Sequence, residues 1–156
     1  MPSPDRRGSQ ASKLASLKRA ASAAEKAKQQ TIKDAITEGN KARDASQFEL
    51  ALASYEKVKE LDPEDERAPY GIGNVYVDLY CNDSAIEAYL AALKLNDKYP
   101  EAIIGLGYAY AAKERLDDAE AQFRAALGIK SDNVEANLGL ARIYFMKARY
   151  QDAITQ

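Results

Sequence analysis

A 34-residue period dominates this sequence from residue 32 onward. The phrase GIGNVY at 71–76 returns 34 residues later as GLGYAY at 105–110. The period divides the chain into four units, 32–65, 66–99, 100–133 and the incomplete 134–156, and positions within a unit are numbered as places 1 to 34. A repeat of this length predicts an array in which each unit packs on its neighbours.

Small and aromatic residues recur at fixed places of these units. Place 8 holds Gly39, Gly73, Gly107 and Ala141; place 20 holds Ala51, Ala85, Ala119 and Ala153; and place 24 holds Tyr55, Tyr89 and Phe123. Places 4, 7, 8 and 11 share one helical face and places 20, 24 and 27 share another. Each unit is therefore predicted to be two helices joined by a short turn. Glycine inside a helix costs about 0.8–1 kcal/mol relative to alanine, so we expect the place 8 glycine to bring the two helices close together, with the aromatic alongside.

The alternative for GIGNVY is a dinucleotide-binding loop. That fingerprint requires a third glycine, where this chain has Tyr76, and a strand before it. The sequence offers neither, which favours the packing interpretation.

The recurring pattern resembles the tetratricopeptide repeat family over about residues 32–156. The segments YGIGNVYVDLYCNDSAIEAYLAALKLN and IIGLGYAYAAKERLDDAEAQFRAALGI are its strongest matches, whereas Glu38 and Ala42 depart from the family's usual apolar and aromatic residues. The resemblance implies an all-α, right-handed α-solenoid of stacked helix-turn-helix repeats, with three full repeats and a partial fourth. It also implies a concave face, lined by the first helix of each unit, that binds a peptide or an amphipathic helix of a partner protein.

Places 2, 5, 9, 12 and 13 of each first helix point away from its packed face and are expected to line this groove. In units three and four they include Ala111, Ala112 and Met146. The candidate groove residues are Tyr70, Asn74, Val77, Ile104, Tyr108, Leu138, Arg142 and Phe145. The competing interpretation is that some of them pack between repeats.

Some members of the family hold an acidic C-terminal tail through a two-carboxylate clamp of Lys, Asn and Arg residues. At the corresponding places this chain has Tyr70, Asn74, Gly105, Glu135 and Gly139, or Ile36, Asn40, Gly71, Glu101 and Gly105 one unit earlier. Only the asparagines match. The sequence therefore disfavours such a clamp.

The composition argues against catalysis within these residues. The chain has no histidine and a single cysteine, Cys81, so no metal or cofactor site and no catalytic residue is predicted. The carboxylate runs Glu64–Asp65–Glu66 and Asp117–Asp118 lie at turns and helix starts, which favours a structural role. We expect a non-catalytic adaptor. The alternatives are the substrate-docking arm of a larger enzyme such as a transferase, and a scaffold that self-associates through its C-terminal repeat.

Charge separates the first 30 residues from the rest. They hold seven Lys or Arg against two Asp or Glu, and the remainder holds fifteen against twenty-two. We expect a disordered tail over 1–10 and a basic, alanine-rich helix over 11–31 that docks on the first unit or frays. The basic segment has three interpretations: a solvated tail, a contact with an acidic surface or an anionic membrane, and a nucleic-acid-binding segment. The last is disfavoured because no aromatic residue interleaves the charges.

The two ends of the chain carry further expectations. No apolar run reaches the roughly 18–20 residues that span a bilayer, and no signal peptide is evident, so a bacterial or organellar cytoplasm is expected. Unit four stops at Gln156, part-way through its expected second helix and before its place 24. Solenoids end on a polar capping helix, so a parent chain that continues is predicted.

Overall fold

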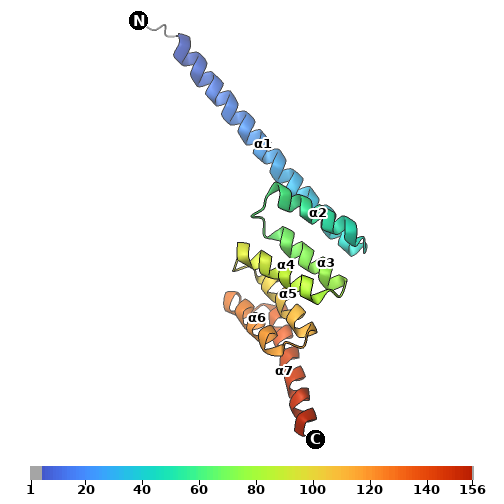
Figure 1. The fold of residues 1–156 in the computed structure, drawn as a ribbon. Coiled ribbons are helices and arrows are strands. Elements are labelled where there is room, and N and C mark those ends of the chain that lie inside the picture. The colour runs from blue at the N-terminus through green and yellow to red at the C-terminus, as the bar shows by residue number, and fades with distance from the viewer. Residues whose placement is uncertain (1–4, 156) are drawn as a thin grey trace.

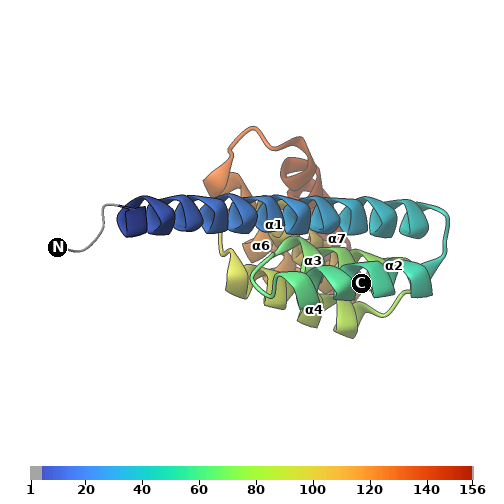
Figure 2. The same ribbon diagram turned by 90° about the horizontal axis from the view of Figure 1, so that it is seen from above.

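A computed structural model describes residues 5–155, with side chains placed for 8–151, and every regular element in it is an α-helix. The first six helices form three successive antiparallel pairs, and the seventh helix packs on the third pair, so that all of them stack along one direction (Figures 1 and 2). Their bounds are α1 Asp5–Asp44, α2 Phe48–Leu61, α3 Arg67–Asp78, α4 Asn82–Leu95, α5 Pro100–Ala112, α6 Leu116–Ile129 and α7 Val134–Thr155. This is the predicted α-solenoid. None of these helices combines the length and the hydropathy that crossing a bilayer requires.

The N-terminal region differs from the expected tail and separate helix. Residues 5–44 form one helix, and its first part projects from the stack (Figure 1). The expected boundary near residue 31 is bridged by a side-chain hydrogen bond from Gln30 to Asp34 (2.8 Å) and by Thr31 Oγ1 donating to the Ala27 carbonyl. No proline lies between residues 5 and 44 to end the helix. Residues 8–14 and 16–30 are exposed, so this segment does not cover the first unit; residues 1–4 lie outside the described part.

The turn inside each complete unit uses a left-handed residue at place 15. Ser46, Tyr80 and Glu114 have φ of 58°, 59° and 58°. Only glycine adopts this region without steric cost, yet all three positions carry a side chain. The turn is therefore held by the packing of the helices on either side of it.

Unit four does not make this turn within the described residues. Ala148 occupies its place 15, and α7 continues as a helix through Thr155 where a second helix was expected to fold back. In units one to three a ring at place 24 packs against the first helix of its own unit. No described residue of unit four packs in this way, and a left-handed alanine would carry a steric cost.

The core is organised around the place 24 rings, each of which fills a space left by two glycines. Tyr89, in α4, lies between Gly73 of its own unit and Gly105 of the next. A Cβ added to either glycine would lie 2.7 Å or 2.6 Å from the ring. Tyr55 has the same relation to Gly39 and Gly71, and Phe123 to Gly107 and Gly139. The glycines therefore make room for a ring, rather than for the backbone of the second helix as the sequence suggested.

The first helices of units two and three consequently have two buried edges. One edge, at places 4, 7, 8 and 11, meets the second helix of the same unit, as predicted. The other, at places 3, 6 and 10, meets the preceding unit, and the sequence analysis missed it. In units two to four it carries small residues at its first two places, Ala68, Ala102 and Ala136 at place 3 and Gly71, Gly105 and Gly139 at place 6. Unit one has Asp34, Thr37 and Lys41 there, all exposed, as suits a helix with no unit before it.

Candidate peptide-binding surface

The first helices of consecutive units touch one another, and the second helices do not. In the described chain α1 contacts α3, α3 contacts α5 and α5 contacts α7, whereas no pair among α2, α4 and α6 is in contact. Helices that approach on one side of a stack and separate on the other give the stack a concave and a convex face. The first helices therefore line the concave face.

The candidate residues of α3 are partly used by the fold. Tyr70 is half-buried, with its ring tilted against the rings of Tyr99 (5.1 Å between centroids) and Tyr89 (6.1 Å). Asn74 accepts a hydrogen bond from the Tyr89 hydroxyl through Oδ1 (2.7 Å). Val77 is half-buried and packs against the core cluster that contains Tyr89. Only parts of these side chains remain on the surface.

Ile104 departs from the groove prediction. It is 3% exposed and lies in the core cluster that contains Phe123, Ala136 and Ile143. Place 5 of unit three lies against α7, whose Ala136 is small enough to let the isoleucine pack between the two helices. Ile104 therefore stabilises the contact between units three and four and is not free to meet a partner.

Leu138 is the counterpart of Ile104 one unit later. It is 57% exposed, and Phe145, on the same side of α7, is 65% exposed. The described chain has no further first helix to cover them. Leu138 therefore differs from Ile104 in that no described helix packs on it.

Tyr108 and Arg142 both line a cavity between α5 and α7. The cavity has a volume of 240 Å³, and five of its lining residues stand at predicted groove places: Tyr108, Ala111, Ala112, Arg142 and Met146. Its floor is formed by Phe123, Gly139 and Ile143, which sequence reasoning assigned to no site. The recurrence of glycine at place 6 was the signal that would have placed Gly139 beside the Phe123 ring.

Polar groups gather at the mouth of this cavity. The Tyr108 hydroxyl donates to the Glu135 carbonyl oxygen (3.3 Å), and its ring meets Phe123 edge-on, with 5.0 Å between centroids. Burial and the Glu135 carboxylate raise the pKa of Tyr108, while Arg142 opposes them. The hydroxyl is therefore neutral and able to donate at neutral pH. Arg142 is exposed and has no ion-pair partner among the described residues.

The charge arrangement at the N-terminal end of the concave face is different. Arg43 of α1 forms ion pairs with Asp44 and with Asp78 of α3, both at 3.5 Å. This guanidinium is already occupied, whereas that of Arg142 is not. A cationic group available to a ligand therefore lies beside the apolar cavity of units three and four.

The carboxylate runs are engaged in structural contacts. Asp65 pairs with Arg67, and Glu66 accepts a hydrogen bond from Asn96 (3.1 Å). Asp117 pairs with Lys147 (2.6 Å) and Asp118 with Arg115 (2.7 Å). Cys81 is exposed at the start of α4, and no group of three or more His, Cys, Asp or Glu within the described residues has the geometry of a metal site.

The chain is similar in sequence and structure to known repeat domains. The family model described as "Tetratricopeptide repeat" matches residues 70–134. The first TPR of Spaghetti (RPAP3), solved bound to the HSP90 peptide SRMEEVD, is 25% identical, with a TM-score of 0.73 over 76% of this chain and 97% of that one. The first TPR domain of human RPAP3 is 24% identical, with a TM-score of 0.73 over 78% of this chain and 96% of that one.

The fold is shared with larger proteins as well. The O-GlcNAc transferase of Thermobaculum terrenum is 17% identical, with a TM-score of 0.69 over 74% of this chain and 22% of that one. No curated protein matches the sequence significantly. The helix pair before residues 70–134 and the single helix after them follow the same period, and each takes part in the packing of one ring between two glycines. Residues 70–134 are therefore tetratricopeptide repeats, and the chain shares the fold of solved tetratricopeptide repeat domains.

Proposed function

We propose that this chain is a non-catalytic interaction module that captures a segment of a partner protein on its concave face. The α5–α7 cavity receives an apolar side chain of that segment, and Arg142 binds a carboxylate or a carbonyl oxygen next to it. The observation that carries the proposal is the apolar cavity with an unpaired guanidinium at its mouth. Peptide binding by the similar Spaghetti domain supports the choice of a peptide ligand.

The proposed recognition differs from a two-carboxylate clamp. Asn74 is hydrogen-bonded to Tyr89, and Gly105 and Gly139 face the Tyr89 and Phe123 rings. No lysine or arginine stands at these places. One guanidinium beside one apolar pocket suits a segment with an apolar anchor and a single adjacent acidic group better than it suits a polyacidic tail.

The experiment is a selection of random twelve-residue peptides, displayed on phage, against the immobilised chain. The affinity of the enriched peptides is then measured by fluorescence anisotropy for Ala112→Phe, which fills the cavity mouth, and for Arg142→Gln. We expect each substitution to weaken binding at least tenfold. Arg149→Gln, on the same helix but outside the cavity, is the matched control and should change the affinity less than twofold. Absence of enriched peptides, or unchanged affinity for Ala112→Phe and Arg142→Gln, would contradict the proposal.

A further inference from the structure

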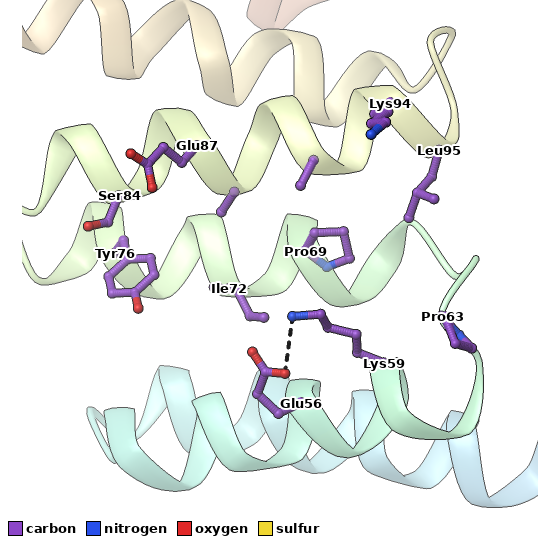
Figure 3. Close-up of a pocket in the computed structure, with 12 residues that line it drawn as sticks. Glu56, Lys59, Pro63, Pro69, Ile72, Tyr76, Ser84, Glu87, Lys94 and Leu95 are labelled. Atoms are coloured by element: carbon purple, nitrogen blue, oxygen red, sulfur yellow. Dashed lines mark ion pairs between the residues drawn. The ribbon is translucent and has the colours of Figure 1, made fainter.

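A second cavity lies on the convex face, between α2 and α4. It has a volume of 500 Å³, and its floor is formed by three residues of α3: Pro69, Ile72 and Tyr76 (Figure 3). Because the second helices do not touch one another, the floor is reached from the convex side. Nothing in the concave site uses this cavity.

One residue explains why the cavity exists at this junction. Place 28 of the second helix is Leu93 in unit two and Leu127 in unit three, and both leucines pack on the core cluster around Ile103 and Phe123. In unit one the same place is Lys59, whose side chain is 56% exposed. A lysine keeps its ammonium group in water, so it does not fill the space that leucine fills elsewhere.

A residue in the floor of the cavity is a second reason why the space is open at this junction. Place 4 is Pro69 at this junction and the larger Ile103 at the next, where isoleucine belongs to the core cluster. The two changes, Lys59 for leucine and Pro69 for isoleucine, leave an open space beside the half-buried Tyr76, above Pro69 and Ile72, which expose little of their own surface. A concave space with an apolar lining is favourable for burying an apolar group of a ligand.

The charged groups around the cavity are separated along its length. Glu87 and Ser84 lie at the end near Tyr76, and Lys94 lies at the opposite end near Leu95 and Pro63 (Figure 3). Between them Lys59 pairs with Glu56 (3.3 Å). Both lysines are in the last turns of their helices, where a positive charge complements the helix dipole. The cavity therefore offers negative charge at one end, positive charge at the other and apolar surface between them.

We infer that this cavity is a second docking site, for a segment of a partner protein in which one apolar side chain stands between a basic and an acidic residue. The apolar side chain covers Ile72 and Tyr76. The basic residue meets Glu56 and Glu87, and the acidic residue meets Lys94. Such a site would let the module hold two segments at once, one on each face.

The test selects the same peptide library against the Ala112→Phe chain, in which the concave cavity is filled. We expect enriched peptides with an apolar residue between a basic and an acidic one. Lys59→Leu, which restores the leucine of the other two units, should weaken their binding at least tenfold while raising the melting temperature. Lys57→Leu makes the same chemical change on the same helix outside the cavity and should leave the affinity within twofold.

The outcomes separate this inference from the concave proposal. Peptides that bind the Lys59→Leu chain unchanged, peptides without the two flanking charges, or the absence of any enrichment would each overturn the convex site. Peptides of the concave class lose affinity on Arg142→Gln and not on Lys59→Leu, so failure of one site leaves the other still measurable.

Discussion

The hydroxyl of Tyr89 donates a 2.7 Å hydrogen bond to Oδ1 of Asn74, and one unit earlier Tyr55 does the same to Asn40 at 2.6 Å. In unit three both partners change. Place 24 is Phe123, which has no hydroxyl, and place 9 is Tyr108, whose ring meets Phe123 edge-on. The polar pair is thus replaced by an aromatic pair, and this exchange gives the α5–α7 cavity its apolar floor.

Loss of the Tyr89–Asn74 hydrogen bond should cost stability. We expect Tyr89→Phe to lower the free energy of unfolding by about 1 kcal/mol, the usual contribution of one such bond, because the ring still fills the space between Gly73 and Gly105. Urea denaturation followed by circular dichroism measures the change. Tyr76→Phe is the control, since its hydroxyl makes no hydrogen bond to a described residue. Equal effects of the two substitutions would refute a stabilising role for the bond.

The buried tyrosines predict a loss of stability at alkaline pH. Burial raises the pKa of Tyr55 and of Tyr89, whereas an unfolded tyrosine ionises near pH 10. The folded state therefore retains protons that the unfolded state releases, so the stabilisation is complete below about pH 10 and is lost as pH rises above it. Denaturation at pH 8 to 11.5 should show this decline, and the Tyr55→Phe, Tyr89→Phe chain should show a shallower one. Parallel curves for the two chains would contradict the assignment.

The left-handed turn residues predict a gain in stability. Tyr80 has φ 59° and is 89% exposed, so little packing is lost when its side chain is removed. Relief of the left-handed strain, about 1–2 kcal/mol, outweighs the entropy of glycine, about 0.5–1 kcal/mol. Tyr80→Gly should therefore stabilise the chain by about 0.5–1 kcal/mol in thermal denaturation. Leu79→Gly, one residue earlier, should not stabilise it, and a lower melting temperature for Tyr80→Gly would count against the argument.

Ile104 and Leu138 occupy the same place in successive units and should respond differently to substitution. Ile104→Ala removes a buried side chain and is expected to cost about 2–4 kcal/mol. Leu138→Ala alters an exposed one and should cost less than about 0.5 kcal/mol. Denaturation of the two variants measures the difference. Similar costs would mean that Leu138 is covered, or that Ile104 is free.

Much of the fold could be predicted because the 34-residue period repeats the information for each helix pair. The period alone does not show which residues at the same place are buried in one unit and exposed in another. Ile104 and Leu138 look alike in sequence, and only the presence of a neighbouring helix decides which is buried. The continuous α1 was missed for a related reason, since a polar first helix and a basic helix before it give no residue at which one ends and the other begins.

The edge that joins successive units has a sequence signal of its own, which was not interpreted as a contact. Gly71, Gly105 and Gly139 recur at place 6 as regularly as the place 8 glycines, yet a single-unit view of the period assigns them no contact. The α5–α7 and α2–α4 cavities could not be predicted from the period. Each arises where the side chains of two adjacent units leave a space between them, and the sequence shows this only once the packing partners of each place are known.

A matched pair of glycine substitutions tests the packing account most directly. A Cβ on Gly105 would lie 2.6 Å from the ring of Tyr89, which is fixed by burial and by its hydrogen bond, whereas a Cβ on Gly128 of α6 meets nothing within 4 Å. The account predicts that Gly128→Ala raises the free energy of unfolding, by up to about 1 kcal/mol, through helix propensity alone. Gly105→Ala should lower it by about 1–3 kcal/mol through overpacking. A stabilising Gly105→Ala would contradict the claim that the rings and glycines hold the repeats together.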